Sequence, residues 1–168
     1  MNTKYYLAYG SNLSVQQMAE RCPRAVYVGK AMIPNYELMF KGSQSGSYLT
    51  IEAREGASVP VLVWQITDYD ERCLDRYEGY PSFYYKRNLT VEVEPLLSMG
   101  SMVELDALVY IMHEDRSLGC PTLEYYATCI DGYEHFGFDA KFLQKALARS
   151  IGTRDANQLL REVGFNEY

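Results

Sequence analysis

The sequence predicts an α+β fold, a small and mostly antiparallel sheet or barrel with helices packed at one side. The order of the elements predicts it: a strand and a helix open the chain, a run of strands with one inserted helix follows, and helices end it. This segregation is typical of α+β proteins, whereas a doubly wound sheet needs regular alternation. Because the 168 residues contain neither a repeat nor an obvious linker, we expect a single domain over 1–168.

Strands are predicted where β-branched, aromatic and other apolar residues are enriched. These segments are about residues 4–9, 25–32, 36–41, 48–53, 59–66, 85–94 and 103–112. The segment NLTVEVEP alternates most clearly, because apolar Leu89, Val91 and Val93 are separated by polar residues. One face of that strand should be buried and the other exposed.

The first two helices have clear end signals. SVQQMAERCP begins with Ser14 three residues before Gln17, a capping-box pattern, and must end by Cys22 because Pro23 follows. TDYDERCLDRYEGYP offers a threonine N-cap, acidic residues in the first turn and a glycine stop, in the order Thr67, Asp68, Asp70 and Gly79.

Three further helices are predicted near the C-terminus. The first two are TLEYYATCIDGYEHF and DAKFLQKALARS, and the second carries an apolar stripe of Phe142, Leu143, Ala146 and Leu147. TRDANQLLREVGF adds the last helix, with Thr153 or Asp155 near its cap.

Composition excludes several classes of function. Sixteen Lys and Arg against 22 Asp and Glu give a net charge of −6 without a basic run, so nucleic acid is not expected as a partner. The apolar N-terminal stretch is broken at Gly10, too short for a signal peptide or a membrane span, and we expect a cytoplasmic protein. No metal or other cofactor is expected. The two histidines, His113 and His135, lack the spacing of a zinc site. The four cysteines form no C-x-x-C pair: Cys22, Cys73, Cys120 and Cys129.

The stretch YLAYGSNL, residues 6–13, joins the first strand to the first helix. Backbone N–H groups at a helix start suit an anion, Gly10 lets the main chain approach a ligand, and Ser11 and Asn12 add polar side chains. An ordinary tight turn followed by an N-cap would have the same composition. The stretch is neither a Walker loop nor a dinucleotide fingerprint.

Glu78 stands in an electrostatically unfavourable place, in the last turn of its predicted helix directly before Gly79. The local sequence surrounds it with aromatic residues, namely Tyr77, Tyr80, Phe83, Tyr84 and Tyr85. Both effects raise the pKa of a carboxyl group, as a general acid or base near neutral pH requires. The alternative is a solvated glutamate at a helix end. Tyr85 and Tyr125 are further candidates for the wall of a polar pocket, although most of the 16 tyrosines should be structural.

Three motifs together resemble the γ-glutamylcyclotransferase family, including its AIG2-like relatives. They are YLAYGSNL, DRYEGYPSFYYKR and YYATCIDGYEHFGFDAKFLQKAL, which span roughly residues 5–147. The resemblance implies a small mixed, mostly antiparallel β-barrel with flanking helices and a cavity. It implies an enzyme that closes the γ-glutamyl group of a small-molecule substrate to 5-oxoproline and releases an amine, with Glu78 as acid/base. The γ-glutamyl group would be bound by Tyr9, Gly10, Ser11, Asn12 and Leu13 together with Tyr85 and Tyr125.

Several points stay open at this stage. The leaving group could be an amino acid, a peptide, an amine or part of a biosynthetic intermediate; the GSNL wording favours amino acids over the γ-glutamylamine branch. Some relatives have Tyr where this chain has Phe142, which leaves a hydroxyl contact in doubt. The rival hypotheses are a non-catalytic binding protein of the same fold and a thiol enzyme using Cys129 with His135. A homodimer also stays open.

Overall fold

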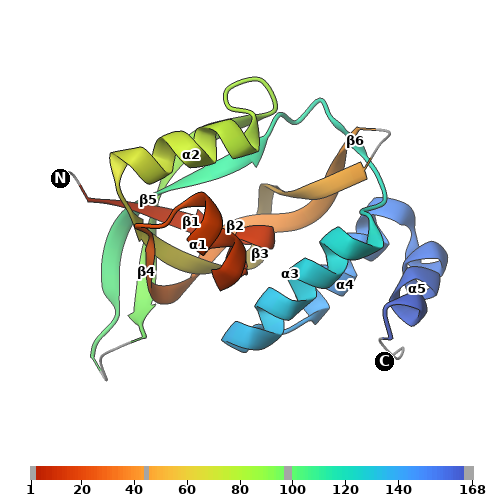
Figure 1. The fold of residues 1–168 in the computed structure, drawn as a ribbon. Coiled ribbons are helices and arrows are strands. Elements are labelled where there is room, and N and C mark those ends of the chain that lie inside the picture. Colours follow the sequence, from red (N-terminus) through yellow and green to blue (C-terminus); the bar gives the residue numbers. More distant parts are fainter. Residues whose placement is uncertain (1–2, 44–45, 97–99, 165–168) are drawn as a thin grey trace.

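The computed structural model describes residues 3–43, 46–96 and 100–164 (Figure 1). The strands are β1 (Lys4–Ala8), β2 (Val26–Ser43), β3 (Gly46–Ile66), β4 (Tyr84–Pro95), β5 (Val103–Met112) and β6 (Ser117–Leu118). The helices are the 3₁₀ turn η1 (Ser11–Leu13) and α1 (Val15–Arg21), α2 (Asp68–Glu78), α3 (Leu123–Phe136), α4 (Lys141–Ile151) and α5 (Thr153–Glu162).

Strands β1 to β5 form a closed mixed barrel, which confirms the predicted fold class. The strand order is β3-β1-β5-β4-β2-β6, and pairing of β2 with β3 closes the ring. The pairings are antiparallel except between β1 and β5, which run parallel where Tyr6 faces Leu108. The barrel brings the end of β1, and with it the YLAYGSNL stretch, into the middle of the molecule (Figure 1).

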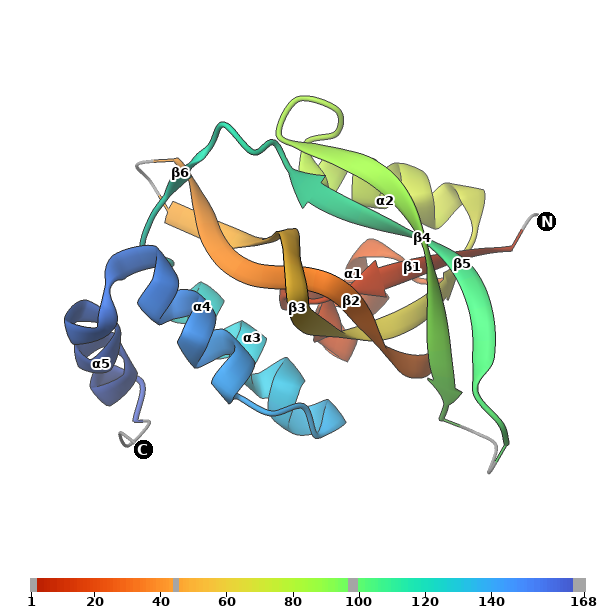
Figure 2. The same cartoon turned by 180° about the vertical axis from the view of Figure 1, so that it is seen from behind.

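The hairpin of β2 and β3 differs from the prediction. Four separate strands were expected here, but each pair is one continuous strand. The expected break near Asn35 is a local irregularity, since the register shifts between Pro34 and Tyr36 and Asn35 has a φ of 60°. A bulge lets a long strand bend without losing its partner. The bend allows the two strands to wrap around the barrel (Figure 2).

The predicted helices all form, with ends close to those expected. Ser14 caps α1 by accepting a bond from the Gln17 amide (N···Oγ 3.3 Å). Thr67 and Asp70 form a reciprocal capping box on α2. The caps expected for α5 are not used: Gly152 precedes it, and no side chain caps the helix.

The helices lie in two groups instead of at one side. Figures 1 and 2 both show α2 apart from α3, α4 and α5. The chain enters α2 from β3 and leaves it into β4, so this helix stays near the ends of those strands. Helix α4 packs on β2 with Leu143, Ala146 and Leu147 buried, whereas Phe142 is only partly buried. Across the described ranges, no helix is both long and apolar enough to cross a membrane.

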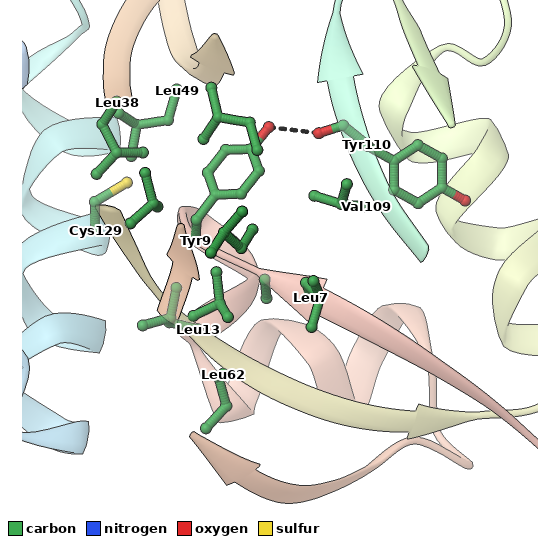
Figure 3. Close-up of a cluster of buried hydrophobic side chains, with 14 of the residues drawn as sticks. Leu7, Tyr9, Leu13, Leu38, Leu49, Leu62, Val109, Tyr110 and Cys129 are labelled. Atoms are coloured by element: carbon green, nitrogen blue, oxygen red, sulfur yellow. Dashed lines mark hydrogen bonds between the residues drawn. The ribbon is translucent and has the colours of Figure 1, made fainter. Parts of the chain in front are cut away.

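The barrel interior is filled by apolar side chains from several strands. Figure 3 shows a part of this core, in which Leu7, Leu62 and Val109 lie near Tyr9 and Leu13. On β4, Val91 and Val93 are buried and Glu92 and Glu94 are exposed, which confirms the predicted alternation. The YLAYGSNL stretch therefore rests on a tightly filled core.

Candidate active site

Glu78 is the last residue of α2, as the sequence predicts. Gly79 ends the helix in the left-handed conformation (φ 65°), which glycine adopts without a Cβ clash. The Glu78 side chain is half-buried, and burial raises its pKa from 4.5 to about 7. A carboxyl group with such a pKa can both accept and donate a proton near neutral pH.

Asn12 joins the turn after β1 to the end of α2. The Asn12 amide nitrogen donates to Oε1 of Glu78 (3.1 Å) and to the Tyr6 hydroxyl (2.9 Å). The backbone oxygen of Asn12 accepts a bond from Nε1 of Trp64 (3.1 Å). Because both the side-chain amide and the backbone oxygen of Asn12 are bonded, its side chain is held in one place beside the carboxyl group of Glu78.

A cavity of about 250 Å³ opens at Glu78. Its walls come from the turn after β1, from β3, from the end of α2, from the α2–β4 connection, from the start of β4 and from α3. The lining residues are mostly aromatic: Ser11, Tyr48, Tyr77, Glu78, Gly79, Phe83, Tyr84 and Tyr125. An aromatic pocket with one carboxyl group and a few hydroxyl groups suits a small polar ligand with an apolar chain.

Two of the predicted binding residues lie in this wall. The Ser11 hydroxyl lies 3.3 Å from the Tyr77 hydroxyl. The Tyr125 hydroxyl accepts a bond from the Leu49 amide (3.1 Å). Gly10 lies directly beside it, and a Cβ at Gly10 would be 3.2 Å from that hydroxyl oxygen. The absence of a side chain at Gly10 therefore leaves room for the Tyr125 hydroxyl.

Tyr9 and Leu13 support the turn from the core side. The Tyr9 hydroxyl donates to the backbone oxygen of Tyr110 (2.6 Å), the bond drawn in Figure 3. Leu13 is fully buried among the barrel side chains. The five predicted residues of the turn thus have different places in the structure. Ser11 faces the cavity, Asn12 is bonded to Glu78, Tyr9 and Leu13 lie in the core, and Gly10 lies beside Tyr125.

Tyr85 is placed away from the cavity. Its hydroxyl donates to Oε1 of Glu114 (2.5 Å), and its ring centroid lies 5.4 Å from that of His113. The preceding residue, Tyr84, lines the cavity instead and donates to the backbone oxygen of Leu49 (2.8 Å). Successive side chains of a strand point to opposite faces, so only one of the two can face the site.

Sequence reasoning missed Tyr6, Tyr48 and Arg21, whose guanidinium nitrogen Nη1 donates to Oδ1 of Asn12 (2.6 Å). Tyr6 is bonded to Asn12, and Tyr48 lines the cavity, where its ring contacts Tyr125 edge-on (centroids 5.1 Å apart). Barrel closure brings Tyr48 to the site, whereas Tyr6 and Arg21 lie only six and nine positions from Asn12 in the chain. The sequence around these residues does not distinguish them from other tyrosines and arginines. The aromatic cluster DRYEGYPSFYY was a usable signal, since Tyr77, Phe83 and Tyr84 all line the cavity.

The cysteine and histidine of the rival hypothesis offer no activated thiol. Cys129 is buried in α3, and burial raises the pKa of its thiol to about 12. The His135 ring packs edge-on against Phe136 (4.7 Å between centroids). A thiol acts as a nucleophile in its deprotonated form, which this environment disfavours. Within the described parts of the chain, no group of three or more His, Cys, Asp or Glu residues could hold a metal ion.

Comparison with known proteins gives one consistent result. A family model described as "Gamma-glutamyl cyclotransferase, AIG2-like" matches residues 6–127. Gamma-glutamylcyclotransferase from Bos taurus is 27% identical over 147 residues, 83% of this chain and 75% of the relative. The Homo sapiens protein of the same name is 27% identical over 150 residues, 85% of this chain and 77% of the relative.

A solved structure named "Gamma-glutamyl cyclotransferase" has the same fold. It superimposes with a TM-score of 0.72 at 22% identity, covering 99% of this chain and 91% of the other. With the family model spanning most of the chain, including the turn and Glu78, these findings establish that the chain belongs to the AIG2-like gamma-glutamyl cyclotransferase family.

Proposed function

We propose that the protein converts a γ-glutamyl amino acid, peptide or amine into 5-oxoproline and the free amine. The observation that carries the proposal is Glu78, a half-buried carboxyl group whose pKa is about 7 and which faces a cavity of about 250 Å³. The family to which the chain belongs supports the same reaction.

The reaction is a ring closure within the substrate. The α-amine nitrogen attacks the γ-carbonyl carbon, a new C–N bond forms, and the bond to the leaving nitrogen breaks. An α-amine is mostly protonated at neutral pH, so the ammonium group first gives up one proton to solvent. As the C–N bond forms, Glu78 takes a second proton from the attacking nitrogen and gives it to the leaving nitrogen, which departs as the neutral amine. Because the nucleophile belongs to the substrate, the protein needs no serine or cysteine nucleophile.

The turn after β1 would stabilise the charge that develops on the carbonyl oxygen. The amides of Leu13 and Ser14 are bonded to the oxygens of Gly10 and Ser11, respectively. The amides of Ser11 and Asn12 open the turn, where helical geometry supplies no internal partner, and they would serve as donors to the oxyanion. The aromatic walls would fold the γ-glutamyl chain so that the amine lies near the carbonyl carbon.

A panel of matched substrates tests the proposal and identifies the leaving group. γ-Glutamyl-alanine and γ-glutamyl-ethylamine differ by one carboxylate on the leaving group, and glutathione represents a peptide. Release of 5-oxoproline above the enzyme-free rate is measured by mass spectrometry. The proposal predicts that at least one of these substrates releases 5-oxoproline. A faster reaction with γ-glutamyl-alanine would indicate an amino-acid leaving group, and a faster reaction with γ-glutamyl-ethylamine would indicate an amine.

Glu78→Gln keeps the shape of the side chain but cannot transfer the proton. General acid–base catalysis contributes about 10²- to 10⁴-fold, so activity should fall at least about a hundredfold. Glu55→Gln, at an exposed glutamate of β3, is the matched control and should stay at the wild-type rate. If no substrate gives 5-oxoproline, the proposed activity is wrong; a fully active Glu78→Gln variant would assign the proton transfer to another group.

A further inference from the structure

Arg21 ends helix α1 next to the candidate active site. One terminal nitrogen of its guanidinium, Nη1, donates to Oδ1 of Asn12 (2.6 Å), and the other, Nη2, donates to Oε1 of Gln17 (2.8 Å). The guanidinium carbon lies 3.6 Å from the centroid of the Tyr77 ring, a wall of the cavity. These three partners carry no negative charge, although arginine usually binds carboxylates through this fork.

The contact with Arg21 determines how the Asn12 amide is oriented. A guanidinium has only donors, so the amide oxygen of Asn12 must face it. The amide nitrogen then points the other way, and its two hydrogens are directed at the Tyr6 hydroxyl and the Glu78 carboxylate. Without Arg21 the amide could rotate and present its oxygen to Glu78, which would repel the carboxylate.

Arg21 also acts on Glu78 through its charge. Both its positive charge and the Asn12 bond lower the pKa of Glu78, against the larger effect of burial. Five further groups whose charge interacts with Glu78 are acids with a raised pKa, so they stay neutral at neutral pH: Tyr6, Tyr9, Cys22, Tyr84 and Tyr125. Both influences that favour the carboxylate therefore depend on Arg21.

We propose that Arg21 is a positioning residue of the active site: it holds the amide of Asn12 so that its nitrogen stays on Glu78, and it supplies a positive charge to that carboxylate. Its relevance to turnover rests on the proposed function, whereas its effect on Glu78 can be measured without turnover. A purely structural role, holding α1 against Tyr77, is the competing explanation.

Arg21→Gln tests the two explanations. We expect Glu78 in this variant to titrate about one pH unit higher than in the wild type, because an opposite charge and a hydrogen bond to the charged form are both lost. Titration is followed by carbon NMR of labelled glutamate side chains, with the Glu78 signal assigned by its absence in Glu78→Gln. The ascending limb of kcat/KM against pH should move by the same amount, giving about tenfold lower activity below the midpoint and a smaller loss above it.

Two further variants complete the experiment. Arg21→Lys keeps the charge but lacks the planar fork, so Glu78 should titrate between the wild-type and Arg21→Gln values; this variant also decides the question if Arg21→Gln does not fold. Arg24→Gln is the control, because Arg24 also lies over a tyrosine ring, that of Tyr69 (5.2 Å), and neither residue lines the cavity. It should leave the Glu78 titration unchanged.

The outcomes separate the two proposals. If Glu78 titrates at the wild-type pH in both Arg21 variants, or if activity falls equally at every pH, the role of Arg21 is structural and the inference is overturned. Absence of 5-oxoproline from the wild-type protein would overturn the proposed function alone, since the NMR titration would still decide what Arg21 does to Glu78.

Discussion

The amide nitrogen of Asn12 lies 3.1 Å from the carboxylate of Glu78, although 66 positions separate them in the chain. Asn12 is the middle residue of the turn η1 after β1, and Glu78 is the last residue of α2. This bond joins the two most informative motifs of the sequence into one site, and it offers a direct test of how the site controls its proton.

Asn12→Asp should raise the pKa of Glu78. The variant replaces a donor by a second carboxylate of nearly the same shape, and like charges disfavour ionisation. We expect the ascending limb of the kcat/KM profile to move to higher pH by about one unit or more. Asn88→Asp, at an exposed position of β4, is the matched control. An unchanged profile in Asn12→Asp would show that this amide does not act on Glu78.

The stability of the protein should fall as the pH rises from about 4.5 to about 7. The Glu78 pKa is 4.5 without its folded environment and about 7 within it, so over this range the folded state binds more protons than the unfolded state. Folding is then favoured at the acidic end, and the contribution lost on going to pH 7 is at most roughly 3 kcal/mol.

Urea unfolding at a series of pH values measures this loss. Glu78→Gln has no proton to lose, so its free energy of unfolding should exceed that of the wild type increasingly between pH 4.5 and 7. A constant difference between the two proteins across this range would mean that Glu78 titrates normally in the folded state.

Gly10→Ala and Tyr125→Phe should be coupled. The new Cβ would lie 3.2 Å from the Tyr125 hydroxyl oxygen, so the ring or the turn must shift, and activity should fall. Removing the hydroxyl relieves the contact, so the double variant should lose less stability than the sum of the single ones. A coupling energy of about 0.5–3 kcal/mol is expected from chemical denaturation; additive losses would place the two residues further apart in solution.

Tyr84→Phe and Tyr85→Phe should differ in activity although they are neighbours. Tyr84 lines the cavity, whereas the Tyr85 hydroxyl is bonded to Glu114. Removing the Tyr84 hydroxyl leaves the Leu49 carbonyl without its partner and should raise KM, at a cost of about 1–3 kcal/mol in stability. Tyr85→Phe should retain the kinetics of the wild type. The reverse ranking would place Tyr85 at the substrate.

The sequence was most informative where the chemistry is local. The caps at Ser14 and Thr67 and the stop at Gly79 were predictable, because such residues satisfy backbone groups within one turn of the chain. The position of Glu78 at a helix end followed from the same signals. The sequence could not distinguish the 3₁₀ turn at residues 11–13 from an ordinary turn, because both use the same small polar residues.

Features that depend on contacts between distant parts of the chain could not be predicted from local sequence signals. The irregularity at Asn35 resembles a loop in sequence, yet pairing along the rest of the hairpin keeps β2 continuous. The choice between Tyr84 and Tyr85 depends on strand register, in which one residue reverses the face. Arg21 reaches Asn12 because α1 packs against the turn η1 that contains Asn12, and no pattern around Arg21 predicts that contact.

Trp64 gives the site a built-in optical reporter. It is the single tryptophan of the chain, and its indole N–H is bonded to the backbone of Asn12. Since indole emission responds to hydrogen bonding and polarity, a ligand that moves the turn changes the signal of one fluorophore, with no second tryptophan to obscure it. Movement of the turn on ligand binding would therefore be seen in the unlabelled protein, before any product is formed.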